Sequence, residues 1–271
     1  MKEQTGFSDV DGSGRSDALV DYLSLVAQHV GEFRRHGYDL MRLRPGDAVL
    51  DVGCGAGEVC VELAAIVGPQ GRVAGVDLSA AMIEAARRTA AASGLAIELQ
   101  PASVYQLPFA DGEFDAVRAE RVFQHLDNPE AALREMLRVT KPGGRVLTSD
   151  PDHGQGGLAL DDPAHRRVYE ALQRAMARMI TNPHSGTRLR GMFVRVGMRD
   201  VEQLVKSFDF NHTEFMQMFF VFERLAAAAA AGEITAQEGE GFLAAIEERH
   251  QAGTFYGSAI GYTVAGTKPM G

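Results

Sequence analysis

A glycine-rich run is the stretch of this chain whose residues could most clearly do chemistry. Residues 49–58 read VLDVGCGAGE, so a short apolar run breaks into three glycines and then continues into an apolar helical pattern. Glycine lets backbone N–H groups approach a ligand closely, and the bend between a strand and a helix is the usual ligand site of a doubly wound sheet. The run therefore predicts a site for a nucleotide-like cofactor.

The residue that opens the following helix narrows the choice of cofactor. A dinucleotide fingerprint needs a third glycine three residues after the second, and this chain has Glu58 there. An acidic side chain at a helix N-terminus opposes a diphosphate, but it tolerates a ligand whose one carboxylate lies beside a cationic amino group. S-adenosylmethionine is such a ligand, so we expect it here.

A second acidic residue supports an adenosyl ligand. Asp77 ends the apolar run at residues 72–76, about twenty residues beyond the glycines. A carboxylate at the end of a strand can accept hydrogen bonds from both hydroxyls of a ribose. The glycine run and Asp77 together form a much more specific pattern than either does alone.

Four motifs in this order resemble the class I S-adenosylmethionine-dependent methyltransferases, in particular the type 11 branch of ubiquinone and menaquinone biosynthesis enzymes. They are VLDVGCGAG at 49–57, GVDLS at 75–79, LPF at 107–109 with FDAV at 114–117, and KPGG at 141–144. The resemblance covers about residues 40–152. It implies a Rossmann-like fold, S-adenosylmethionine as cofactor, S-adenosylhomocysteine as product, and methyl transfer as the reaction.

The resemblance also implies a set of cofactor-binding residues. Relatives carry an aspartate at Ser103, where it accepts a hydrogen bond from the adenine amino group, and a hydroxyl can accept that bond without the help of a charge. The set comprises Gly53 and Gly55 at the methionine end, Asp77 at the ribose, Leu78 and Met82 beside the adenine, Ser103 and Val104 at its edge, and, as further members of the site, Asp51, Cys54 and Glu120. For Glu120, a surface ion pair is the alternative.

His125 is our candidate for a general base. It lies a few residues beyond the strand predicted at 114–119, and imidazole is the side chain that titrates near neutrality. A structural histidine is the alternative. Since the sulfonium leaving group already carries a positive charge, the protein's part in catalysis is mostly alignment and exclusion of water.

Five residues are candidates for binding the substrate. Asp152 and His153 follow the predicted fifth strand on the ligand side, where turn formation is the competing role and a metal site a weaker one. Phe215 and Phe219 belong to an aromatic stretch that could cover a pocket, pack in a core or form a subunit interface. Tyr22, on the N-terminal helices, could close over the site. We expect no metal.

Alternating strands and helices must position these residues. Apolar runs predict strands at 48–52, 72–76, 97–100, 114–119 and 145–149, with helices at 59–67, 80–92 and 129–139 between them. Strands separated by helices indicate a parallel sheet with helices on both faces. Later segments predict helices at 163–180, 188–196, 213–231 and 235–251 and strands at 201–210 and 255–267.

The predicted fold class is therefore α/β. We expect a Rossmann-like, doubly wound, seven-stranded and mostly parallel sheet, with N-terminal helices and a helical cap inserted before the last strand. Residues 1–16 are expected to be a flexible leader and residues 17–271 a single domain, with the core at about 40–152 and cap elements at about 160–198 and 213–251.

Composition limits the partners. The 27 basic and 36 acidic residues give a formal charge of -9, which repels nucleic acids and anionic membrane surfaces. The absence of a long apolar run and of a cysteine pair spaced for zinc favours a reduced, cytoplasmic protein. We expect a small-molecule substrate, no nucleic acid or membrane partner, and a monomer or homodimer.

Two other functions are compatible with this kind of sheet. One is a protein that keeps the cofactor fold for a biosynthetic step without methylation, such as a cyclisation. The other is a nicotinamide-dependent oxidoreductase, which Glu58 and the LPF motif disfavour. Methyl transfer to an acceptor of the natural-product or secondary-metabolite kind is the function that the motifs favour.

Overall fold

The computed structural model describes residues 16–270, and side chains from residue 29 onward. The predicted leader lies outside the described residues except for Ser16, where helix α2 (Ser16–Met41) begins. The side chain of Tyr22 is also outside them, so its predicted contact with substrate stays a prediction. Among the described residues, no helix has both the length and the apolar composition that a bilayer crossing needs.

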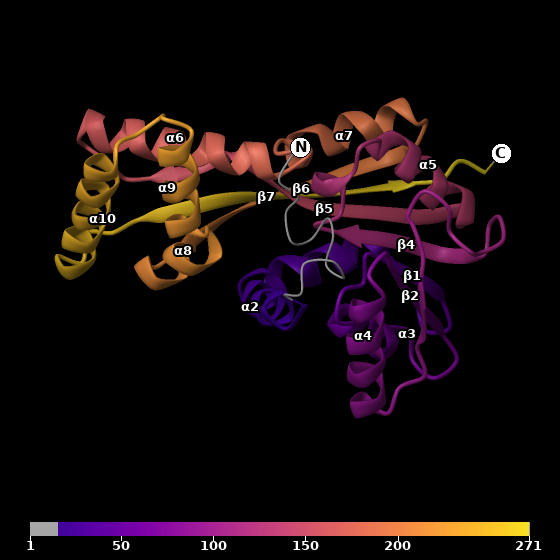
Figure 1. The fold of residues 1–271 in the computed structure, drawn as a ribbon. Helices are drawn as coiled ribbons and strands as arrows, with labels where there is room; N and C mark the ends of the chain where they lie inside the picture. The colour runs from indigo at the N-terminus through magenta and orange to yellow at the C-terminus, as the bar shows by residue number, and fades with distance from the viewer. Residues whose placement is uncertain (1–15, 271) are drawn as a thin grey trace.

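Seven strands form one mostly parallel sheet, as predicted for the fold class, and their order is β3-β2-β1-β4-β5-β7-β6 (Figure 1). The first five strands in the chain pair in parallel, and β7 runs antiparallel to both of its neighbours. The strands are β1 (Ala48–Val52), β2 (Arg72–Asp77), β3 (Glu98–Pro101), β4 (Phe114–Glu120), β5 (Thr140–Leu158), β6 (Arg199–Phe210) and β7 (Gly257–Thr267).

Helices cover both faces of this sheet. Figure 1 shows α2, α3 (Glu58–Val67) and α4 (Ala80–Ser93) on one face, and α5 (Pro129–Val139) and α7 (Ser185–Arg195) on the other. Each face buries its own apolar core: Leu63 and Ile83 belong to one, Leu133 and Phe193 to the other. The strands between them are buried on both faces, as expected of a parallel sheet.

Local chemistry explains where the core helices begin and end. The Ser79 hydroxyl accepts a hydrogen bond from the Met82 amide at 3.1 Å, which caps α4, and Gly94 ends that helix in the left-handed region at φ 70°. The Asn128 side chain caps α5, and Pro129 occupies its first turn. These signals are readable in the sequence, and the predicted ends agree within one or two residues.

Strands β5, β6 and β7 continue past the end of β4 and carry the cap. Residues 156–158 of β5 still pair with β7, although β4 ends opposite Ser149. Helices α6 (Pro163–Met179), α8 (His212–Met218), α9 (Val221–Ala230) and α10 (Ala236–Gln251) pack on this extension and bury a third core. The cap is thus an outgrowth of the sheet.

Two predicted elements were wrong in their extent. The fifth strand is 140–158 rather than 145–149. Thr140 already pairs with Phe114 of β4, and pairing with β7 keeps the backbone extended through Pro151 and the glycines after it. The helix predicted at 213–231 is two helices, α8 and α9, separated at Phe220, whose φ of 47° lies in the left-handed region that interrupts a helix. A short 3-10 helix, η1 (Phe123–His125), was not predicted.

Glycine 57 offers a test of how tightly α3 and α4 pack. Gly57 and Gly94 have nearly the same backbone conformation, but a Cβ at Gly57 would lie 2.8 Å from the Ala86 Cβ, whereas one at Gly94 meets nothing within 4 Å. We expect Gly94→Ala to lower the free energy of unfolding by about 1–2 kcal/mol, from backbone strain alone. Gly57→Ala should lower the free energy of unfolding by about 1–3 kcal/mol more than Gly94→Ala does, because α4 must move. Urea unfolding measures both; equal losses would contradict the packing.

Candidate functional site

The candidate cofactor site lies where the strand order reverses, at the carboxyl ends of β1, β2 and β4. β2 and β4 pair with β1 on its two sides, so the chain changes direction across the sheet at this point. Such a switch point is the usual ligand crevice of open α/β sheets. The loop after β1 bends through Gly53 and Gly55, which have φ angles of 72° and 52°. A Cβ at Gly53 would lie 2.3 Å from a methyl of Val122, so only glycine brings this backbone close to the loop after β4.

Asp77 connects the second strand to this loop. Its Oδ2 accepts a hydrogen bond from the Gly55 amide at 3.0 Å, and its Oδ1 accepts one from the Ser79 amide at 2.9 Å. A carboxylate oxygen can accept more than one hydrogen bond, which is the chemistry that the hydroxyls of a ribose require. The neighbouring Leu78 is 73% exposed, which leaves an apolar side chain ready to pack against a flat ring.

The other predicted cofactor residues lie around these two strands. Cys54 and Met82 are buried, and Val104 is buried in the loop after β3. Cys54 packs against Gly75, as expected for a small packing residue. The Ser103 hydroxyl accepts a hydrogen bond from the Tyr105 amide at 3.2 Å, so this hydroxyl first of all shapes its own turn.

A buried ion network joins the first and fourth strands. Arg118, in the middle of β4, is 1% exposed, and its guanidinium lies 3.3 Å from the Asp51 carboxylate and also donates to Glu120. Arg34 on α2 donates to Glu120 at 2.9 and 3.0 Å. Burial raises the pKa of Asp51 to about 6, whereas Arg118 and Arg34 overcome burial at Glu120 and hold its pKa at about 2.

The sequence did not predict a site role for three further members of this network, Arg118, Tyr38 and Glu62. Arg118 lies between the apolar residues Val117 and Ala119 in a core strand, and a charge in that position is a signal that could have identified it. Tyr38 and Glu62 share a hydrogen bond of 2.5 Å, and Glu62 also lies 3.4 Å from Arg34. The network therefore fastens α2 to the rim of the cofactor site.

The residues of this site fit S-adenosylmethionine. The loop presents backbone at two left-handed glycines, Asp77 offers acceptors for a ribose, and Leu78 offers an uncovered apolar surface. Glu58 opens α3 and disfavours a diphosphate there. Acidic side chains at the ends of three strands suit a ligand that carries a sulfonium and an ammonium group.

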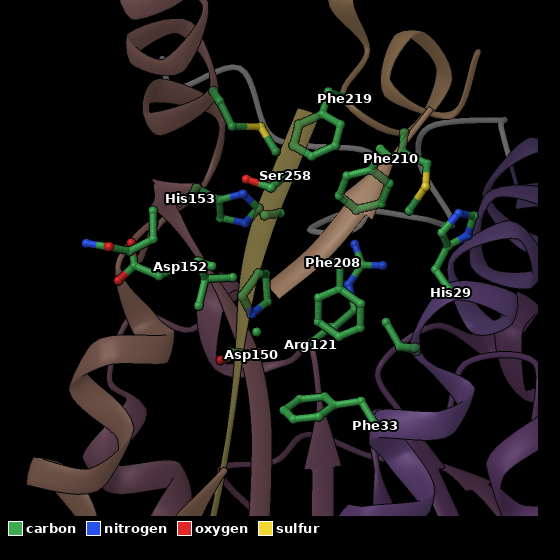
Figure 2. Close-up of a pocket in the computed structure, with 18 of the residues that line it drawn as sticks. His29, Phe33, Arg121, Asp150, Asp152, His153, Phe208, Phe210, Phe219 and Ser258 are labelled. Carbon is green, nitrogen blue, oxygen red and sulfur yellow. The ribbon is translucent and has the colours of Figure 1, made fainter. Parts of the chain in front are cut away.

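A cavity of about 120 Å³ adjoins this site (Figure 2). Glu120 and Arg34 line it, so the ion network forms its boundary with the cofactor site. Its other walls come from the start of the β5 extension, from β6 and β7, and from helices α2, α6, α8 and α9. The predicted residues Asp152, His153 and Phe219 all line this cavity.

One wall of the cavity is aromatic. Phe33 and Phe208 meet edge to face with ring centroids 5.5 Å apart, and Phe210 and Phe219 do so at 5.1 Å. Figure 2 shows these four rings along one side of the cavity. Phe215, which we predicted to contact substrate, is 2% exposed and stacks on Phe219 at 5.0 Å, so it supports the wall from within the cap core.

The opposite wall holds a buried carboxylate in the middle of β5, just past the end of β4. Asp150 is 2% exposed, and its Oδ2 accepts a hydrogen bond from the Ser185 hydroxyl at 2.8 Å. Its Oδ1 is buried without a hydrogen-bond partner among the described residues. Burial raises the pKa of Asp150 to about 7, although Ser185 and Arg121 favour the ionised form.

Asp152 and His153 continue this polar wall. Asp152 accepts hydrogen bonds from Thr187 at 2.5 Å and from His184 at 3.0 Å; these partners outweigh burial and lower its pKa. His153 lies 2.7 Å from the side-chain oxygen of Gln124, and burial lowers its pKa to about 3, with Arg224 and Arg121 acting in the same direction. His153 is therefore neutral near pH 7.

His125, the predicted base, is the last residue of η1, in the segment that follows β4. Burial lowers its pKa to about 4, and Arg121 adds to this effect. The described residues that line the cavity include Arg121 and His153 but not His125. Within the same part of the chain, no three His, Cys, Asp or Glu side chains come together as a metal site requires.

Comparisons with known proteins define the class. Residues 50–148 match the family model Methyltransf_11, described as a methyltransferase domain. The ubiquinone/menaquinone biosynthesis C-methyltransferase UbiE of Pseudomonas fluorescens (strain SBW25) is 31% identical over 186 residues, which cover 68% of this chain and 71% of that protein. The chain belongs to the class I S-adenosylmethionine-dependent methyltransferase family, in its type 11 branch.

Solved structures agree on the fold. The YcgJ protein of Bacillus subtilis superposes with a TM-score of 0.57 at 21% identity, over 88% of this chain and 100% of that one. The cyclase SpnF superposes with a TM-score of 0.56 at 23% identity, over 90% and 82%. The chain spans about half the length of several curated relatives it matches, from 42% to 61%.

The raised pKa of Asp150 predicts a pH-dependent stability. Because the folded protein binds this proton more tightly than the unfolded chain, stability from Asp150 is complete below pH 3.8 and is lost as the pH rises to about 7. The interval from 3.8 to about 7 corresponds to at most about 4 kcal/mol. The free energy of unfolding of Asp150→Asn, relative to that of the wild type, should therefore be higher at pH 8 than at pH 5. Urea unfolding at both pH values measures this difference.

Asp152→Asn is the matched control, because the pKa of Asp152 is lowered instead of raised. Its carboxylate stabilises the fold above its ordinary pKa, so the asparagine variant should be less stable than the wild type at pH 8. Identical pH profiles for the wild type and Asp150→Asn would contradict the burial of a charge at Asp150.

Proposed function

We propose that this protein transfers a methyl group from S-adenosylmethionine to a small molecule bound in the cavity beside Glu120. The observation that carries the proposal is the Asp77 carboxylate, which holds the glycine loop and stands next to the uncovered Leu78 at the switch point of the sheet. This arrangement suits an adenosine, and the acidic rim beyond it suits a cation.

The proposed cofactor residues divide by the part of the ligand that they meet. Asp77 takes the ribose, Leu78 and Met82 flank the adenine, and the loop at Ser103 and Val104 meets its edge. Asp51, Gly53, Cys54, Gly55 and Glu120 surround the methionine end. When bound, the sulfonium supplies a methyl group that is already activated for displacement.

The chain's own contribution is to align the acceptor and to keep water out. The aromatic wall holds a flat apolar molecule, and the polar wall of Asp150, Asp152 and His153 fixes its orientation. Fixing both reactants in register removes much of the entropic barrier of a two-molecule reaction. Arg34 on α2 closes the boundary between the two sites through Glu120.

The acceptor that we propose is a flat ring compound with polar substituents. Four phenylalanines on one wall give apolar contact to a ring, whereas the opposite wall presents hydrogen-bonding groups. The matched relative from Pseudomonas fluorescens is named for quinone biosynthesis, which is consistent with a ring acceptor. The mass of the product separates methylation, which adds one methyl group, from a cyclisation, which adds none.

Asp77 provides the direct test. Asp77→Asn removes the charge that receives the ribose hydroxyls, and a hydrogen bond to a charged group contributes about 1.5–3 kcal/mol. We therefore expect the affinity for S-adenosylmethionine to fall by about 10-fold to 100-fold in calorimetric titration.

Asp111→Asn is the control, because that side chain is 81% exposed and lies before β4, at the opposite end of the strand from the site. It should bind S-adenosylmethionine like the wild type. If the wild-type protein itself gives no heat with saturating S-adenosylmethionine, the proposed function is wrong.

A further inference from the structure

The imidazole of His153 is a polar group of the cavity whose hydrogen bond fixes its tautomer. Its Nε2 lies 2.7 Å from the Oε1 of Gln124, and the Nε2 amide of Gln124 donates to the Arg121 carbonyl at 3.1 Å. That second bond turns the glutamine oxygen towards His153. Since an amide oxygen can only accept, the hydrogen of His153 must be on Nε2, and its Nδ1 carries a lone pair.

The surroundings hold this tautomer in place. Gln124 is 2% exposed, and its carbonyl accepts a hydrogen bond from the Asn182 amide at 2.8 Å. The His153 amide donates to the Pro183 carbonyl at 2.8 Å. Among the described residues, only Gln124 hydrogen-bonds the His153 ring. The Nδ1 lone pair is therefore left for a ligand in the cavity that the ring lines (Figure 2).

The charges around His153 keep the ring neutral. Arg224 and Arg121 lie close enough to disfavour a proton on it, and burial has a larger effect in the same direction, whereas Asp152 opposes them. A neutral imidazole offers an acceptor and no competing charge, so it selects a ligand group that donates a hydrogen bond. A hydroxyl on a ring packed against the phenylalanine wall is such a group.

We propose that His153 is the proton acceptor for a hydroxyl of a flat aromatic substrate, and that Gln124 is the positioning residue that keeps Nδ1 ready. The inference rests on the proposed methyl transfer. The hydroxyl oxygen forms a bond to the methyl carbon as the carbon–sulfur bond breaks, and that electron pair stays on sulfur. The hydroxyl proton moves to Nδ1, so the positive charge lost at sulfur reappears on the imidazole.

The timing of the proton transfer suits an imidazole. A phenol holds its proton tightly before reaction, but its oxygen becomes strongly acidic as it gains a bond to carbon. A neutral imidazole therefore leaves the bound phenol neutral and takes the proton as the new bond forms. His125 lies outside the lining of the cavity and would need another group to relay the proton.

Two substitutions of His153 separate its two nitrogens. His153→Gln places an amide near the former Nε2, so it keeps a partner for Gln124 and loses the Nδ1 acceptor. His153→Asn places an amide oxygen near the former Nδ1, so it keeps an acceptor that cannot take a proton. With S-adenosylhomocysteine present, the wild type should bind 2-naphthol about 10-fold more tightly than 2-methoxynaphthalene, which lacks the hydroxyl hydrogen.

The variants should differ in a defined way. His153→Asn should keep the preference for 2-naphthol, and His153→Gln should lose it. Both should methylate 2-naphthol at least about 100-fold more slowly than the wild type, with S-adenosylmethionine affinity unchanged. In ¹⁵N-histidine spectra, the wild type should show Nε2–H on His153; Gln124→Met should lose this tautomer, and Gln124→Glu should keep it.

Several results would overturn the inference. They are an Nδ1–H tautomer in the wild type, a His153→Gln variant that methylates 2-naphthol at the wild-type rate, or a wild type that binds S-adenosylmethionine but neither binds nor methylates 2-naphthol. In each case intact cofactor binding leaves the proposed function standing, whereas loss of cofactor binding by the wild type would remove both.

Discussion

The burial of Arg118 is the constraint on which the rest of this molecule depends. A guanidinium in the middle of a parallel sheet is stable only with carboxylates beside it, and Asp51 and Glu120 provide them from the ends of β1 and β4. Removing one partner of a buried ion pair typically costs about 3–5 kcal/mol, because the other charge stays buried. The two strand ends that form the cofactor crevice are therefore held in register by charge as well as by backbone hydrogen bonds.

The same network decides where α2 lies. Glu120 receives Arg34 as well as Arg118, so α2 is attached to the sheet at the boundary between cofactor and cavity. Farther along, Glu32 on α2 pairs with Lys206 on β6, and His29 approaches Glu214 on α8. One helix thus contacts the core, the edge strand and the cap, and its residues His29, Phe33 and Arg34 line the cavity.

The sequence predicts the cofactor side of the site better than the substrate side, and the reason is physical. The glycine loop and Asp77 are set by short-range geometry: φ angles that only glycine adopts easily, and a carboxylate at a strand end. The wall of the cavity depends on β5 continuing to residue 158, which pairing with β7 imposes on a segment full of proline and glycine. The break at Phe220 depends equally on how α8 and α9 pack within the cap.

The choice between histidines illustrates the same limit. His125 and His153 both follow core strands in the sequence, and both are kept neutral by burial. His153 lines the cavity and His125 does not, and the orientation of the Gln124 amide beside His153 depends on a carbonyl of the left-handed residue Arg121, at φ 60°. No pattern of residue types encodes that orientation, because it arises only when the ends of β4 and β5 lie side by side.

Charge balance links the two sites. Three carboxylates, those of Asp51, Glu62 and Glu120, meet two guanidiniums, those of Arg34 and Arg118, and the difference is one negative charge beside the cofactor crevice. This charge stabilises the sulfonium of the cofactor before the reaction. After methyl transfer the sulfur is a neutral thioether. The wall across the cavity is different, because His153 is neutral and Asp150 has a pKa of about 7. The fold thus keeps a net negative charge beside the cofactor crevice and groups of low net charge on the far wall of the cavity.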